Sequence, residues 1–221
     1  MNGQSIQQRI WRGYAKAAAV LGSACQFSRP ASGVTPTVWT DPVTHTLNNP
    51  LFCRYVSLNA EDMKYSKPNK YGKATWYALV DGCGLQPGDY FVGSEGTFFV
   101  AALQALLPIL VVECNRTVTL SRVPRQTAVG AVSYSGMTQQ NETPYVSGVP
   151  CSILQGTKGE KNEADLPGDV RLPWWVLLMP ASVGTVLYGD LIVDDLGKRY
   201  IASSVELTDL GYRITAMQAN T

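Results

Sequence analysis

The sequence predicts a mainly β protein with one N-terminal α-helix, an α+β chain with two small antiparallel β-modules that are barrel- or sandwich-like. Three observations predict this fold class. Apolar residues follow a helical spacing near the N-terminus, β-branched and aromatic residues dominate short runs after it, and one hairpin motif occurs twice. With 221 residues, of which 45% are hydrophobic and 16% charged, the chain can bury the core of one large or two small domains.

The first expected element is an amphipathic helix within residues 1–27. Ser5 fits an N-cap, and Gly22 fits the point where the helix stops. Apolar side chains recur at the spacing of one helical face. They are Ile6, Ile10, Tyr14, Ala17 and Leu21.

The same helix carries most of the positive charge of the N-terminal arm. Four basic residues precede the first acidic residue, Asp41, so the arm carries +4 and the rest of the chain −3 of a net charge of +1. These residues are Arg9, Arg12, Lys16 and Arg29. At about 100° per residue the three on the helix form a separate stripe, and Gly13 leaves room for close approach on the apolar face.

This stripe makes the helix a candidate docking element. We expect a protein partner, because a glycine and several alanines on the helix invite close packing. DNA phosphates, a membrane surface and a simply solvated helix face are the alternatives. The candidate docking residues are Arg9, Trp11, Arg12, Gly13, Tyr14 and Lys16.

Residues 28–52 are predicted to form an extended arm. This segment contains four prolines and many Ser, Thr and Asn residues, a composition that prevents continuous helix. The prolines are Pro30, Pro36, Pro42 and Pro50. The arm therefore reads as a linker or a crossover between the helix and the β-modules.

An internal repeat defines the two modules. Residues 88–101 and 189–202 both obey the pattern GDxxVxxxGxx(F/Y)xA. The Gly-Asp pair enters a strand, a glycine turns the chain, and an aromatic-led strand returns beside the first, which predicts a β-hairpin used twice. The repeat residues are Gly88, Asp89, Gly96, Gly189, Asp190 and Gly197.

The flanks of the two hairpins set the expected module boundaries. A third strand follows each hairpin, Ile109 to Leu120 in the first and Gly211 to Gln218 in the second. The first module is predicted over 53–125 and the second over 126–221, with a polar, mobile loop at 155–169.

The residue types favour a protein without catalytic, cofactor or metal sites. The single histidine, His45, lies in the arm, and the five cysteines are widely spaced without a CxxC pair. Cys83 stands between two glycines, as in a tight turn. Asp194 and Asp195 could supply paired carboxylates for glycoside cleavage, but they fall in the second hairpin turn and have no counterpart in the first copy.

Cysteine usage and hydropathy bear on the compartment. Unpaired cysteines fit folding in a reducing cytoplasm. The longest apolar run, Phe98 to Val112, is interrupted by Gln104 and Pro108 and is shorter than the roughly 20 residues that cross a bilayer. We therefore expect no membrane partner.

Three segments resemble uncharacterised structural proteins of bacteriophage and prophage particles. They are Arg9 to Gly22 followed by Arg29 and Pro30, Gly88 to Arg122, and Gly189 to Arg213. The last is also similar to the hairpin motif of head-completion, stopper and neck proteins. The resemblance implies a homo-oligomeric ring of the neck, collar or head-to-tail connector, made in the cytoplasm of a bacterial host and located in the virion.

In that role the ring would contact a portal or adaptor protein, tail proteins and, transiently, DNA in its lumen. Two other roles remain open within a virion: a baseplate or tail-hub protein, and a cell-wall hydrolase using Asp194 and Asp195. A bacterial surface or carbohydrate-binding protein is a further alternative, which would need an export signal.

Overall fold

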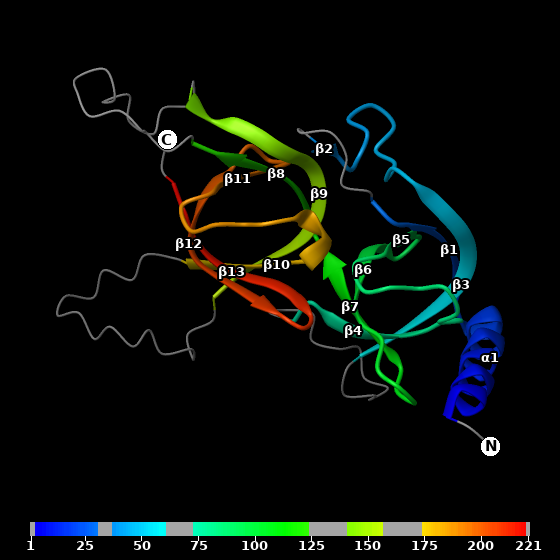
Figure 1. Cartoon of the computed structure of the whole chain (residues 1–221). Helices are drawn as coiled ribbons and strands as arrows, with labels where there is room; N and C mark the ends of the chain where they lie inside the picture. Colours follow the sequence, from blue (N-terminus) through cyan, green and yellow to red (C-terminus); the bar gives the residue numbers. More distant parts are fainter. Residues whose placement is uncertain (1–2, 31–36, 61–72, 124–140, 157–173, 220–221) are drawn as a thin grey trace, which may run out of the picture.

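The computed structural model describes residues 3–30, 37–60, 73–123, 141–156 and 174–219, which form one α-helix and two β-sheets (Figure 1). This architecture confirms the prediction of a mainly β chain with one N-terminal helix. In Figure 1 the two sheets lie side by side, and helix α1 (Gly3–Leu21) lies on the outer flank of the first.

The first sheet is a closed six-stranded barrel. Its strands pair antiparallel in the order β1-β3-β4-β7-β6-β5, and β5 returns to β1. The strands are β1 (Ser23–Ser28), β3 (Pro50–Ala60), β4 (Thr75–Leu79), β5 (Tyr90–Gly93), β6 (Gly96–Ala102) and β7 (Ile109–Cys114). Closure removes exposed sheet edges from this half of the chain.

The second sheet repeats this arrangement. Its order is β10-β13-β12-β11-β8-β9, and β10 also pairs with β9, so these six strands close into a ring as well. The strands are β8 (Arg116–Arg122), β9 (Thr143–Gln155), β10 (Trp174–Met179), β11 (Leu191–Asp194), β12 (Arg199–Thr208) and β13 (Gly211–Gln218). A 3₁₀ turn, η3 (Ala181–Val183), follows β10, and the short strand β2 (Thr37–Val38) pairs parallel to β9 from outside the ring.

The two barrels have the same topology. Replacing the six strands of the first barrel, in chain order, by β8 to β13 converts the first strand order into the second. The predicted repeat is therefore a repeat of whole barrels. Of the two predicted architectures, barrel and sandwich, the structure shows the barrel.

The barrels begin earlier than the predicted modules. Ser23–Ser28, placed partly in the helix segment by the sequence, forms β1 and pairs with β3 and β5. The predicted strand from Ile109 to Leu120 divides at Asn115, whose side-chain amide donates to the Ile153 carbonyl and accepts the Ile153 N–H. These two hydrogen bonds join the chain to β9, so the second barrel starts at Arg116.

Both predicted hairpins are present, but their turns differ in length. In the first, Gly93 pairs with Gly96 across two residues. In the second, the Asp194 N–H donates to the Lys198 carbonyl across three. The extra residue shifts the returning strand by one position, so Tyr200 corresponds to Phe98 rather than to Phe99, which the sequence pattern had aligned with it.

Alternating side chains build two apolar clusters. Phe27, Phe91 and Phe98 point into the first barrel, where Phe91 stacks on Phe98 and packs at a tilt against Phe27, with centroid distances of 5.2 and 5.1 Å. Tyr90 and Phe99 are their strand neighbours and point the opposite way. They are buried in the cluster that fills the second barrel, so this cluster also joins the two barrels.

The arm crosses between the barrels and docks on the second. Strand β2 pairs with β9, and the Trp39 N–H donates to the Ser147 carbonyl at 2.9 Å. The Trp39 ring is 1% exposed and packs edge-on against Tyr90, with ring centroids 5.8 Å apart. The predicted crossover is therefore packed in part against the protein itself; residues 31–36 lie outside the described part of the chain.

Candidate functional site

The Gly-Asp turn of the first barrel is fixed by a buried ion pair. The Asp89 carboxylate is completely buried and accepts hydrogen bonds from Arg29 Nε at 2.6 Å and Nη2 at 2.8 Å. It also accepts the Gln86 N–H at 2.8 Å, while Arg29 Nη2 donates to the Gly84 carbonyl. The two-pronged geometry is the strongest that an arginine and a carboxylate can form.

The second barrel repeats this ion pair group by group. Asp190 accepts hydrogen bonds from Arg122 Nε at 2.8 Å and Nη2 at 2.7 Å, and from the Leu187 N–H. Arg122 Nη2 also donates to the Thr185 carbonyl. One partner is added, because the Tyr145 hydroxyl donates to Asp190 at 3.0 Å. The repeated Gly-Asp motif is thus a structural device that holds the turn before β5 and before β11.

Hydrogen bonding to the aspartates also acts on the two arginines. It raises the pKa of Arg29 and of Arg122 above the usual arginine value, so both guanidinium groups stay charged. The Arg29 side chain is therefore committed to Asp89. The other three basic residues of the N-terminal arm, Arg9, Arg12 and Lys16, lie on α1 (Gly3–Leu21).

Sequence reasoning missed these arginines as partners of the Gly-Asp motif. A signal was present: a Ser-Arg dipeptide stands at the end of the first strand of each barrel, at Ser28-Arg29 and Ser121-Arg122. Both serines are buried, at 2% and 6% exposure. The two Ser-Arg dipeptides are too short to stand out until strand pairing shows their equivalence.

The two Gly-Asp turns differ in their surroundings. Gly88 and Gly189 both have positive φ, +92° and +84°, a conformation that favours glycine. A Cβ on Gly88 would lie 2.9 Å from Ser182 Oγ in the second barrel, whereas a Cβ on Gly189 would meet nothing within 4 Å. The first turn is covered by the second barrel, and the second turn is open. Gly96 and Gly197 also have positive φ, in the hairpin turns.

Helix α1 packs one side on the first barrel and exposes the other. It contacts β3 and β4, Ala18 is completely buried, and the Trp11 ring fills the space where Gly82 lacks a side chain. The packed side overlaps the predicted face, since Ile10, Tyr14 and Ala17 are half-buried, but it leaves out Leu21, which is 74% exposed. Trp11, which the sequence assigned to docking, lies instead on this packed side.

The remaining predicted docking residues also differ in their exposure. Tyr14 is half-buried, and four residues are exposed: Arg9, Arg12, Gly13 and Lys16. A Cβ on Gly13 would meet no atom within 4 Å, so the surface around it is open. The exposed side of α1 therefore presents basic residues around a glycine.

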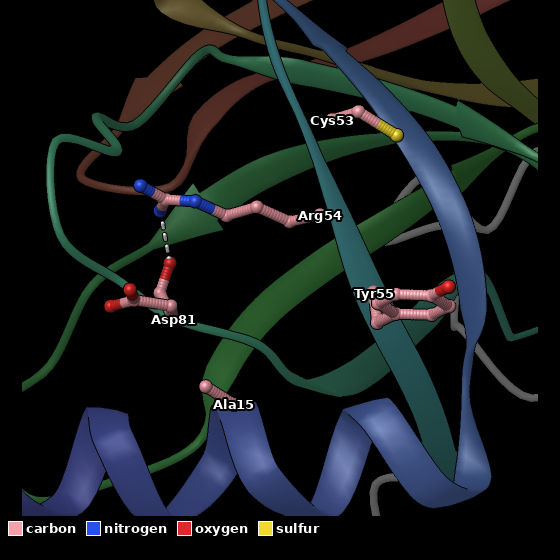
Figure 2. Close-up of a pocket in the computed structure, with 5 residues that line it drawn as sticks. All are labelled: Ala15, Cys53, Arg54, Tyr55 and Asp81. Carbon is pink, nitrogen blue, oxygen red and sulfur yellow. Dashed lines mark hydrogen bonds between the residues drawn. The ribbon is translucent and has the colours of Figure 1, made fainter.

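A shallow hollow lies between α1 and the first barrel (Figure 2). Its lining residues are Ala15, Cys53, Arg54, Tyr55 and Asp81. Arg54 Nη1 donates to the carbonyls of Asp81 and Cys83, at 2.5 and 2.7 Å, and fixes the loop after β4. Figure 2 shows Arg54 reaching toward Asp81, while Cys53 and Tyr55 point away from it.

The carboxylates considered for hydrolysis lie in the longer hairpin turn. Asp194 is 6% exposed and accepts hydrogen bonds from the Leu196 and Lys198 N–H groups and from the Tyr200 hydroxyl. Asp195 is exposed, and its carboxylate lies 3.9 Å from Arg116 Nε. Asp194 thus organises the turn.

The other two candidates for chemistry also lie in turns. The Cys83 N–H donates to the Asp81 carboxylate, and His45 is exposed with a φ of +54°. Within the described ranges, no group of three or more His, Cys, Asp or Glu residues could hold a metal ion. In the same part of the chain, no helix is long and apolar enough to span a membrane.

No protein-family model matches the chain, and neither a curated protein nor a solved structure matches it.

Proposed function

We propose that this chain is a ring-forming structural subunit of a bacteriophage particle, placed in the neck or head-to-tail connector. The observation that carries the proposal is the contact between the two barrels. They share one strand order, yet each uses a different part of its surface to meet the other. A contact between unlike surfaces of like units is the kind that generates rings when repeated.

The exposed side of α1 supports a second contact, to an unlike protein. Arg12 and Lys16 flank the open surface at Gly13, and the helix is anchored to the barrel by Trp11. A rigid basic helix of this kind fits an acidic surface of a portal, adaptor or tail protein. The chain beyond the basic N-terminal arm, which includes Arg29, carries a net charge of −3, which suits the passage of DNA through a ring without retention.

Locating the chain in a particle tests this proposal. Purified particles of the virus or prophage that encodes the chain would be labelled with antibodies raised against it and imaged by electron microscopy. We expect label at the junction of head and tail. Label at the far end of the tail would replace the neck with the baseplate or hub, and particles that lack the chain would overturn the structural role.

Variants of the helix test its docking role. Arg12→Glu combined with Gly13→Leu should reverse the charge and block close approach, leaving particles without joined tails. Lys198→Glu, at an exposed basic residue in the second hairpin turn, is the matched control and should leave assembly unchanged. Normal assembly with the helix variant would remove α1 from the docking contact.

A further inference from the structure

The strand registers define which surfaces of the two barrels correspond. Val56 pairs with the first residue of β1 and Cys151 with the first residue of β8, so the residues before them, Tyr55 and Pro150, are counterparts. Likewise, Ser57 pairs with Leu79 at the end of β4, and Ser152 pairs with Leu178 near the end of β10. The loop 81–84 after β4 therefore corresponds to the loop 180–185 after β10.

Within the chain, the Gly-Asp turn of the first barrel sits on this surface of the second. The Tyr90 hydroxyl donates to the Pro150 carbonyl at 2.8 Å, and both groups are buried. On the other side of the contact, Gly88 approaches Ser182 and Pro180 in the loop after β10. The intramolecular contact thus joins one barrel's Gly-Asp turn to the other barrel's Pro150 and 180–185 surface.

Each half of this contact has a counterpart elsewhere in the chain. In the second barrel, the turn before Asp190 is uncovered: Leu187 is 40% exposed, Tyr188 is 80% exposed, and Gly189 faces open space. In the first barrel, the counterpart of the Pro150 surface is the hollow beside α1, where Tyr55 is 54% exposed and Cys53 is exposed. The Trp11 ring covers Gly82 in the loop 81–84, so the open part of this surface lies at Tyr55 and Cys53.

We propose that the 187–189 turn of one copy docks in the Tyr55 hollow of the next copy and so repeats between chains the contact that joins the two barrels within a chain. The partner is a second copy of this chain. This inference rests on the proposed function, because it names the surfaces through which a ring would form.

The chemistry of the two surfaces fits this contact. Tyr188 and Leu187 present an aromatic and an aliphatic side chain, and Tyr55 presents a ring beside the thiol of Cys53. Large exposed aromatic residues of this kind are enriched at the centre of interfaces. Leu191, the counterpart of Tyr90, is only 3% exposed and has no aromatic ring, so Tyr188 supplies the ring in its place.

The contact can be tested in solution, without particles. Tyr188→Asp removes one surface and Tyr55→Asp removes the other; both side chains are exposed, so each variant should fold, which circular dichroism would check. Val43→Asp, at a residue that is 83% exposed in the arm, is the control. Sedimentation velocity at tens of micromolar should show assemblies larger than a dimer for the wild type and the control, and monomers for each variant alone.

Mixing the two variants gives the decisive outcome. The intact turn of Tyr55→Asp chains fits the intact hollow of Tyr188→Asp chains, so an equimolar mixture should form dimers and stop there. A monomeric mixture, a monomeric wild type, or single variants that assemble like the wild type would each overturn the inference.

A thiol cross-link identifies the surfaces directly. With Tyr188→Cys, mild oxidation should form a disulfide between copies to Cys53 or Cys83, the two exposed native cysteines, as mapped by peptide mass spectrometry. Cross-links between two introduced thiols alone would indicate a two-fold contact and overturn the inference. If the chain is found in particles but the cross-link does not form, the proposed function stands and this contact is overturned. If the chain is absent from particles, the proposed function is overturned, while the contact measured in solution stands.

Discussion

The two barrels share a strand order and differ in what covers them. Phe99 and Val112 on the outer face of the first barrel are 1% and 4% exposed, because the second barrel packs over them. Their counterparts in the second barrel, Ile201 and Met217, are half-buried and 42% exposed. The duplicated fold thus uses one face as an interior in the first copy and leaves it as a surface in the second.

The hairpin turns show a second difference. The first turn spans two residues between glycines, while the second spans three and depends on the buried carboxylate of Asp194. Equivalent strands have therefore kept their positions through different turn chemistry. Substitutions at matched positions of the two barrels test these differences.

The largest effect is expected at the covered face. Phe99→Ala should lower the free energy of unfolding by about 3–5 kcal/mol, because it opens a cavity between the barrels. The matched Ile201→Ala should lower it by only about 1–2 kcal/mol, since that side chain is already partly in water. Urea denaturation followed by tryptophan fluorescence measures both, and equal losses would contradict the difference in burial.

The next effect is expected at the two ion pairs. Asp190→Ala should cost about 3 kcal/mol and Asp89→Ala about 2 kcal/mol, because each removes the partner of an arginine that is only partly shielded from solvent. Asp89→Ala should cost less than Asp190→Ala, because Asp190 also accepts a hydrogen bond from the Tyr145 hydroxyl. Thermal unfolding gives the order of stability. Equal losses, or a reversed order, would contradict a contribution from the extra hydrogen bond.

A smaller difference is expected between the hairpin turns. Asp194→Ala should cost about 2 kcal/mol, because two backbone N–H groups and the Tyr200 hydroxyl lose their acceptor. Ser94→Ala in the first turn should change stability by less than about 0.5 kcal/mol, since the residue is an exposed turn position. Similar losses in the two variants would mean that both turns depend on side chains.

A separate effect is a loss of stability in alkali. Burial raises the pKa of Cys25, Cys114 and Cys151 above the ordinary value near 9.0. A pKa that is higher in the folded state contributes stability below the unfolded value, and that stability is lost as pH rises above about 9. Unfolding at pH 8 and pH 10 measures it. Cys53 and Cys83 should react with a thiol reagent in the native state, and equal reactivity of all five would contradict the burial.

The sequence predicted the helix, the hairpins and the repetition because these depend on local patterns. It misplaced the strand containing Asn115, because the hydrogen bonds to Ile153 that divide it come from a segment 38 residues away. It also missed the pairing of Arg29 with Asp89, since the two are separated by 60 residues. Contacts of this range are set by barrel closure, which a local pattern does not encode.

The docking prediction for α1 agrees with the structure for some residues and not for others, for a similar reason. Helical periodicity identified a basic stripe, and Arg12 and Lys16 are indeed exposed. It could not indicate which apolar side chain would meet the barrel, because the fit of Trp11 depends on the missing side chain of Gly82, a residue in another element.

The central claim is that copies of the chain meet through the contact that joins its two barrels. A cryo-electron microscopy structure of the wild-type assembly tests it most directly. We predict that the junction between neighbouring chains superposes on the junction within a chain, with Tyr188 of one copy against Tyr55 of the next. A junction related by a two-fold axis, or one that leaves both tyrosines in solvent, would contradict the account.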